Sequence, residues 1–176
     1  MPAEEVPQLP DRPEPGLPTR VLDALWRVGL RSAYRGLCLY WFLARPKVVG
    51  CYVVVWVRGH VLVIHNSYKG YATVPGGRVD RGEEPRDAAA RELREEVGID
   101  LAPERLRDEG PERGFVQHHH EESYFYSVVL DEVPRVAIDR REVVRAYFSR
   151  PEQMLAGEVA PMVRQHLESR AGSSPV

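Results

Sequence analysis

Three glutamates near the middle of the chain, Glu92, Glu95 and Glu96, have the residue type and the spacing of a site for a hard metal ion. At i, i+3 and i+4 their carboxylates lie on one side of a helix, where like charges repel by roughly 0.2–0.5 kcal/mol per pair. Divalent ions such as Mg²⁺ and Mn²⁺ prefer oxygen ligands and relieve such repulsion. Taken alone, the triplet is more often a helix face in contact with water.

The pair Gly76-Gly77, which precedes these glutamates, is expected to form a turn that exposes backbone at short range. It can offer carbonyl oxygens to a metal or amide groups to a phosphate, because no side chain stands in the way. A metal held there would neutralise phosphate charge and lower the pKa of a bound water. The turn and the carboxylates together favour chemistry at phosphorus.

The full spacing of this segment matches a known motif. Gly77, five residues, Glu83, seven residues and then the run Arg-Glu-Leu-Arg-Glu-Glu-Val-Gly-Ile at 91–99 resembles the Nudix box at every defined position. The resemblance implies an α/β fold, a Nudix-type α/β/α sandwich with a mixed β-sheet. It also implies hydrolysis of a diphosphate linkage in a nucleoside diphosphate derivative, by water attack on phosphorus, with Mg²⁺ or Mn²⁺ as cofactor.

Carried over residue by residue, the resemblance implies a set of metal ligands. Glu95 and Glu96 would be the principal ligands, and Glu92 a further ligand or the base that activates water. Gly76 would lend its carbonyl oxygen to the metal, and Gly77 would allow the turn.

The resemblance also implies residues that support the catalytic glutamates. Arg91 would orient the glutamates, and Glu83 would act through a water or as an orienting group. In the family the general base sometimes lies in a later loop. The sequence does not choose among the later candidates, which are Glu121, Glu122, Glu142 and Glu152.

A helix over 85–97 must carry these carboxylates. Pro85 suits the first helical position, and Gly98 can take the left-handed conformation that ends a helix. Ala89, Leu93 and Val97 form an apolar stripe that should pack on the rest of the domain.

Strands and further helices should surround that helix. The β-branched and aromatic patterns predict strands over 48–57, 61–64, 71–74, 115–117, 123–130 and 142–148, and helices over 151–156 and 159–169. Strands that interleave with helices indicate a mixed sheet covered on its faces. The polar segment 118–122, with three histidines and two glutamates, is interpreted as a solvated loop. The alternative is that one of its histidines or glutamates reaches into the substrate cleft.

Substrate contacts have weaker signals. Arg58, Tyr68 and Tyr124 are candidates, because aromatic side chains can stack on a base and an arginine can bind phosphate. Aromatic residues in strands are more often packing residues, so these positions carry less weight than the glutamates.

The chain before the expected domain divides into two parts. Residues 1–18 contain six prolines and are expected to be a disordered tail, and 19–46 form a basic amphipathic helix that ends at Pro46. The Nudix domain should span 47–170, and 171–176 a loose C-terminal tail. The helix could pack on its own domain, pair with a second chain in a homodimer, or lie on an anionic membrane, the last being least favoured.

Composition narrows the class of protein. The net charge of −2 gives no reason to expect DNA as a partner, and only two cysteines, Cys38 and Cys51, are present. No disulfide framework, signal peptide or transmembrane stretch is expected, so the sequence indicates a cytoplasmic protein. The resemblance to the Nudix box implies an enzyme whose partner is a small nucleoside diphosphate derivative. Cleavage of a capped RNA end and a binding module that has lost turnover are minor alternatives.

Overall fold

A computed structural model describes residues 6–9, 17–138 and 140–170. Within these ranges a mixed sheet is flanked by helices. In chain order the elements are α1 (Leu17–Ala44), β1 (Lys47–Val57), β2 (His60–Asn66), β3 (Ala72–Thr73), β4 (Gly76–Arg78), α2 (Pro85–Val97), η1 (Pro103–Arg105), β5 (Arg107–Val116), β6 (His119–Val129), β7 (Val143–Ser149), α3 (Pro151–Leu155) and α4 (Pro161–Ser169).

The seven strands form one sheet with β1 at its centre. The order is β3-β2-β1-β6-β5, while β4 also pairs with β1 and β7 with β2. The long β1–β6 pair is parallel, from Lys47 opposite His120 to Trp56 opposite Val129, and the other pairs are antiparallel. A parallel pair needs a long crossover, and the segment that contains α2 provides it.

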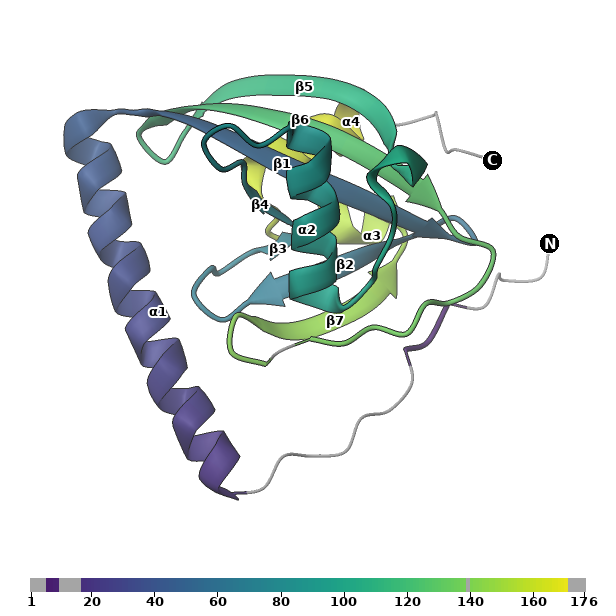
Figure 1. Cartoon of the computed structure of the whole chain (residues 1–176), viewed down its shortest axis with the longest axis horizontal. Coiled ribbons are helices and arrows are strands. Elements are labelled where there is room, and N and C mark those ends of the chain that lie inside the picture. The colour runs from purple at the N-terminus through teal and green to yellow at the C-terminus, as the bar shows by residue number, and fades with distance from the viewer. Residues whose placement is uncertain (1–5, 10–16, 139, 171–176) are drawn as a thin grey trace.

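The sheet is covered on both faces, as expected for an α/β/α sandwich. Val53 and Val55 of β1 join the cluster under α2, whereas Val54 and Trp56 join the cluster under α3 and α4. Figure 1 shows α2 in front of the sheet and α4 behind it. The alternation along β1 therefore supplies both cores from one strand, because successive side chains point to opposite faces. The predicted fold class is confirmed.

Helix α2 begins and ends where its sequence predicts. Pro85 stands in its first turn, and Gly98 ends it at φ 70° with an N–H that donates to the Arg94 carbonyl. Leu93 and Val97 are fully buried. The apolar stripe thus anchors the helix on the sheet and leaves the glutamates on the adjoining side.

Two local predictions are wrong. Gly76–Arg78 is the short strand β4 rather than a turn, because the absence of side chains lets Gly76 and Gly77 lie against Tyr52 and Cys51 of β1. The segment 118–122 is not a solvated loop. Only Gln117 and His118 form the turn, both at positive φ, and β6 begins at His119, which is 2% exposed.

Strand β5 is also longer than the predicted strand over 115–117. It runs from Arg107 to Val116 along the edge of the sheet, and none of its side chains is fully buried. An edge strand half in solvent lacks the apolar alternation on which the sequence prediction depended.

Helix α1 lies along one side of the molecule (Figure 1) and presents its predicted apolar face to solvent. Polar bonds on another face hold it: Arg27 Nε donates to the Arg140 carbonyl at 2.9 Å, Arg31 Nε to the Ser67 carbonyl at 2.9 Å, and Arg141 pairs with Asp23 at 3.1 Å. These bonds turn the helix so that exposed apolar side chains face outward, among them Leu22, Leu25 and Leu43.

Most of the expected N-terminal tail, 1–5 and 10–16, and the whole expected C-terminal tail, 171–176, lie outside the described residues. Within 6–9, Pro7 is buried and Leu9 packs against the cluster under α2. Among the described helices, none has the length and apolar character needed to cross a membrane.

Candidate active site

Arg91 of α2 connects the glutamates of the site. Its Nε and Nη2 donate to the two carboxylate oxygens of Glu83 at 2.9 and 3.1 Å, and its Nη1 donates to Glu92 at 2.7 Å and to Glu95 at 3.4 Å. Hydrogen bonds from Arg91 hold the pKa of the partly buried Glu83 carboxyl below its usual value. Arg91 is thus placed to orient both Glu92 and Glu95.

Strand β4 fits closely against the carboxylate of Glu92. A Cβ added at Gly77 would meet the carboxylate carbon and oxygens of Glu92 at 2.4–2.7 Å, and one at Gly76 would meet the Cys51 carbonyl oxygen at 2.2 Å. Only glycine fits at these two positions while β4 stays on β1. The same absence of side chains lets the backbone of β4 lie directly beside the carboxylates.

Glu96 is the buried member of the triplet. It is 7% exposed and accepts hydrogen bonds from the Gly76 backbone N–H at 2.7 Å and from Asn66 Nδ2 at 3.2 Å. Burial raises the pKa of Glu96 to about 8, against the opposing effect of the Gly76 N–H. The Gly76 amide therefore faces Glu96, and its peptide unit is held beside the site.

Glu92 lies in a similar environment with more solvent. Burial raises its pKa, and the like charges of Glu95 and Glu142 add to that effect, while Arg91 opposes it. Three carboxylates close enough to disfavour one another's charge are chemically suited to a hard divalent cation.

The donor set fits such a cation in kind. Glu92, Glu95, Glu96 and Glu142 offer only carboxylate oxygens, and the buried Asn66 Oδ1 beside Glu96 has no hydrogen-bond partner among the described groups. In the part of the chain that the structure describes, no three carboxylate, histidine or cysteine side chains already converge on one point. The carboxylate of Glu92 is held by its hydrogen bond from Arg91, and that of Glu96 by its hydrogen bond from the Gly76 N–H.

A cavity of about 600 Å³ opens beside these groups. Glu92, Glu95 and Glu142 line one part of it, together with Gly76 and Gly77. Other walls come from the start of β1, the β5–β6 turn and α1, with Tyr34, Leu37, Trp41, Tyr52, Tyr71, Gln117, His119 and Glu121 among the lining residues. The carboxylates therefore border a cleft whose other walls carry several aromatic side chains.

The later glutamates separate clearly in space. Glu142 lines the cleft and accepts a hydrogen bond from the Tyr68 hydroxyl at 2.7 Å, and Glu121 also lines it. Glu122 points elsewhere, paired with Arg113 at 2.9 Å on the edge hairpin, and Glu152 is exposed in the first turn of α3. Of the four later carboxylates, only Glu121 and Glu142 border the cleft.

The three candidate substrate residues are also separated. Tyr68 lines the cleft, but Tyr124 packs against the core cluster under α2. Arg58 lies in the β1–β2 turn, about 20 Å along the strand from Tyr52, which is the cleft residue of β1 nearest to it. The structure brings only one of the three to the carboxylates.

Several cleft residues were not among the sequence candidates. His119 stacks on Trp41 of α1, with ring centroids 4.2 Å apart, and its Nε2 lies 3.3 Å from Glu121. The hydroxyl of Tyr34 donates to Gln117 at 2.8 Å. The i, i+2 spacing of His119 and Glu121 is the signal that could have identified this wall, since alternate residues of a strand share a face.

Comparisons with known proteins agree with this fold. A family model described as the NUDIX domain matches residues 44–168. A MutT NUDIX hydrolase from Burkholderia pseudomallei is 22% identical, with a TM-score of 0.60 over 69% of this chain and 96% of that chain. A MutT protein from Methanosarcina mazei Go1 is 20% identical, with a TM-score of 0.64 over 76% and 99% of the two chains.

A third solved structure, a C. elegans Ap4A hydrolase binary complex, is 20% identical, with a TM-score of 0.60 over 70% of this chain and 95% of that chain. The comparison with curated proteins finds no match. At these identities the solved structures show that the fold is shared, and α1 precedes the first residue of the family match except at its last position.

Proposed function

The chain belongs to the Nudix family, and we propose that it hydrolyses a diphosphate linkage in a nucleoside diphosphate derivative by attack of water on phosphorus. The observation that carries this proposal is the arrangement of Glu92, Glu95 and Glu142 around one cleft, beside a glycine strand that admits no side chain. An acidic cleft of this kind repels a diphosphate unless a cation offsets the charge. The proposal therefore includes a divalent metal.

Mg²⁺ or Mn²⁺ is the proposed cofactor, with Glu92, Glu95, Glu96 and the Gly76 carbonyl as its ligands. When bound, such an ion neutralises phosphate charge and lowers the pKa of a coordinated water. A bifunctional NMN adenylyltransferase/ADP ribose pyrophosphatase from Francisella tularensis, complexed with AMP and a Mn ion, shares the fold at 19% identity and a TM-score of 0.62. That likeness supports the choice of metal without deciding it.

The protein's own groups have distinct roles in the proposed reaction. Arg91 holds Glu92 and Glu95 in position, and Glu83 holds Arg91 through two hydrogen bonds. The Gly76 N–H and Asn66 position Glu96. Glu92 and Glu142 both border the cleft with carboxylates able to accept a proton from water, so they are the proposed alternatives for the general base.

Replacement of Glu96 by Gln tests the proposal. We expect kcat to fall by at least about a hundredfold, because a ligand charge is lost while the hydrogen bond from Asn66 can be kept. Release of phosphate and nucleotide should be followed with Mg²⁺ and Mn²⁺ over nucleoside triphosphates, dinucleotides, ADP-ribose, nucleotide sugars and coenzyme A. Glu168→Gln, a surface change on α4, serves as the matched control. Near-full turnover in the Glu96 variant would refute the assignment.

For the outward face of α1 we propose pairing with a second copy of the chain. Leu25 and Leu43 are 65% and 73% exposed there, and a Cβ added at Gly29 or Gly36 would meet nothing within 4 Å. Small residues between leucines let two helices approach closely. An anionic membrane is less favoured, because Arg27 and Arg31 bond to carbonyl oxygens of the domain, so the basic side of α1 faces the domain rather than outward with the leucines.

Sedimentation velocity checks the homodimer, with Leu25→Ser as the variant that should shift the protein to monomer. Co-sedimentation with anionic vesicles tests membrane binding, and recovery in the vesicle pellet of a protein that stays monomeric would overturn the proposal.

The two free cysteines support the proposal of a reducing, cytoplasmic setting.

A further inference from the structure

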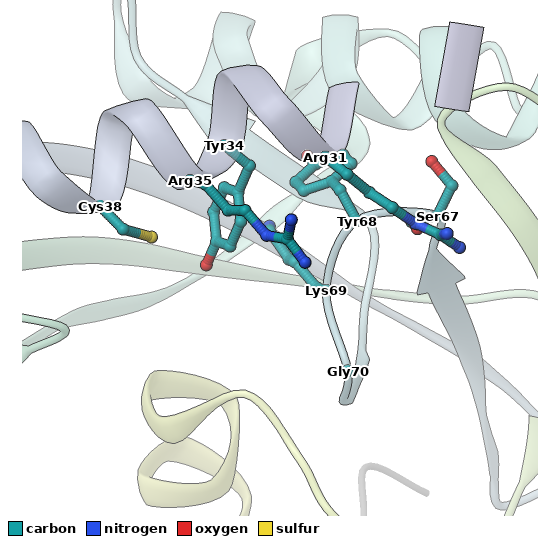
Figure 2. A pocket seen from close by; sticks show the side chains of 8 residues that line it. All are labelled: Arg31, Tyr34, Arg35, Cys38, Ser67, Tyr68, Lys69 and Gly70. Atoms are coloured by element: carbon teal, nitrogen blue, oxygen red, sulfur yellow. The ribbon is translucent and has the colours of Figure 1, made fainter. Parts of the chain in front are cut away.

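A second cavity, of about 560 Å³, lies between α1 and the loop that follows β2 (Figure 2). We propose that it is a phosphate subsite, which binds a further phosphate group of a substrate whose diphosphate is cleaved beside α2. That the bound phosphate belongs to a substrate rests on the proposed hydrolysis, but binding of a phosphate dianion to the cavity requires neither a metal nor catalysis.

The lining of this cavity is cationic. Arg31 and Arg35 come from successive turns of α1, and Lys69 comes from the loop. Figure 2 shows both arginine side chains extending from α1 toward the side of the loop. None of the eight residues that line the cavity is acidic; the other five are Tyr34, Cys38, Ser67, Tyr68 and Gly70. Like charges so placed repel, and a dianion offsets that repulsion.

Two of the cations are held in place by neutral groups. Arg31 Nε donates to the Ser67 carbonyl at 2.9 Å, and the Lys69 ammonium lies 5.4 Å from the centroid of the Tyr68 ring. Neither interaction neutralises charge, and among the described residues no carboxylate lies within 4 Å of Arg31, Arg35 or Lys69. The guanidinium and ammonium groups together match the oxygen geometry of a phosphate.

The cationic cavity adjoins the acidic cleft. Tyr34, Tyr68 and Lys69 line both, and the rings of the two tyrosines lie 5.1 Å apart with a 52° angle between them. The Tyr68 hydroxyl bonds to Glu142 on the cleft side. One molecule can therefore extend past the tyrosine pair into both spaces.

The separation of charge selects a class of substrate. Glu92, Glu95 and Glu142 line the cleft, alongside Lys47 and Arg78, whereas the adjoining cavity is lined by basic side chains and by no acidic one. A diphosphate derivative without any further anionic group leaves Arg31, Arg35 and Lys69 unused. A derivative that carries another phosphate, remote from the linkage that is cleaved, places a dianion among them.

Cys38 provides a readout for this cavity that does not depend on turnover. It lines the cavity and is partly exposed, while Cys51, the only other cysteine, is fully buried. The rate of Cys38 alkylation by N-ethylmaleimide should be measured on the full chain in EDTA, with the labelled peptide identified by mass spectrometry. Inorganic phosphate is the probe, and sodium chloride holds the ionic strength constant.

We expect inorganic phosphate to slow alkylation in a saturable manner, by at least about threefold, and sodium acetate to have little effect, because a dianion binds three cations more strongly than a monoanion does. An unchanged rate at high phosphate would overturn the subsite. Equal protection by acetate would also overturn it, since a general anion effect would then explain the result.

Substitutions localise the effect. Arg35→Gln and Lys69→Gln should each raise the phosphate concentration for half-protection by at least about fivefold. Arg45→Gln, at the end of the same helix and outside the cavity, is the matched control and should leave it unchanged. Equal shifts in Arg35→Gln and Arg45→Gln would contradict the proposal. If phosphate fails to protect Cys38 in the unsubstituted protein while metal-dependent hydrolysis is intact, the subsite alone is refuted. If phosphate protects Cys38 but the protein shows no metal-dependent hydrolysis, the proposed function alone is refuted.

Discussion

The two helices that border the cleft, α2 and α1, are held to the protein in opposite ways. α2 has 13 residues, and its apolar stripe is buried against the sheet. α1 has 28 residues, and its apolar face is turned to solvent while a polar stripe contacts the domain. An amphipathic pattern therefore decides how a helix is oriented on its domain only when the apolar face has a core to pack on.

The same two helices differ in what they bring to the cleft. α2 contributes carboxylates held by Arg91, whereas α1 contributes Tyr34 and Trp41, and arginines to the adjoining cavity. Substitutions in α2 should therefore change stability and chemistry, and substitutions in α1 should mainly change binding.

The largest expected difference concerns one leucine in each helix. Leu93→Ala should lower the free energy of unfolding by about 2–5 kcal/mol, because the fully buried side chain leaves a cavity, whereas Leu25→Ala should change it by less than about 0.5 kcal/mol. Urea denaturation of the two variants measures the difference. Similar losses in both would show that α1 packs more tightly than its exposure indicates.

The two regions also differ in their response to acid, because the domain contains a buried histidine, His166 of α4, whereas α1 contains no histidine. Burial, with Arg170 nearby, lowers the pKa of His166 to about 4. The unfolded chain takes up this proton near pH 6.5, before the folded protein does, so stability falls as pH falls from 6.5 to 4. The full loss is roughly 3 kcal/mol.

Replacement of His166 by Phe, which can keep the stack on Phe125, should flatten the pH dependence of unfolding over that range. His120→Phe, at an exposed position of β6, is the control. An unaltered slope in the His166 variant would show that other groups dominate acid unfolding.

Gly77 of β4 and Gly29 of α1 differ in the space that an added Cβ would meet. Gly77→Ala should lower kcat by about a hundredfold, because the added Cβ displaces the Glu92 carboxylate. Gly29→Ala in α1 should leave kcat unchanged and stabilise the helix by up to about 1 kcal/mol, since its Cβ meets open space. Steady-state kinetics and thermal unfolding of both variants provide the measurements. Full activity in Gly77→Ala would contradict the close fit of β4 around Glu92.

The smallest expected effect concerns Trp41, the α1 residue that stacks on His119. Trp41→Ala should raise KM by about three- to tenfold, with kcat nearly constant, because it removes a cleft wall and leaves the carboxylates in place. Trp26→Ala, on the exposed face of the same helix, is the matched control. A fall in kcat at constant KM would indicate that α1 positions the catalytic groups rather than the substrate.

Local features of the molecule could be predicted from local patterns. Pro85 and Gly98 define the ends of α2, and its period of apolar residues predicts which side is buried, because caps and helical spacing act over a few residues. The strands β4 and β5 could not be predicted. Gly76 and Gly77 have no side chain to signal a strand, and β5 lies at an edge without an apolar face.

The cleft wall opposite α2 required contacts between distant segments. His119 is buried because β6 pairs in parallel with β1 from Lys47 onward and because Trp41 covers it, and neither contact is encoded in the residues next to it. Glu122, one residue from Glu121, faces the edge hairpin instead, since the side chains of a strand alternate.

The residue pattern places carboxylates on the 85–97 helix after a glycine pair, at the spacing of the Nudix box, and this local pattern is enough to identify the family. The tertiary structure alone decided which later carboxylates join them, that α1 forms a wall of the cleft, and that its arginines meet Lys69 in a second cavity. The physical reason is range: helix periodicity and caps act within a few residues, whereas a cleft exists only where segments far apart in the chain are packed together.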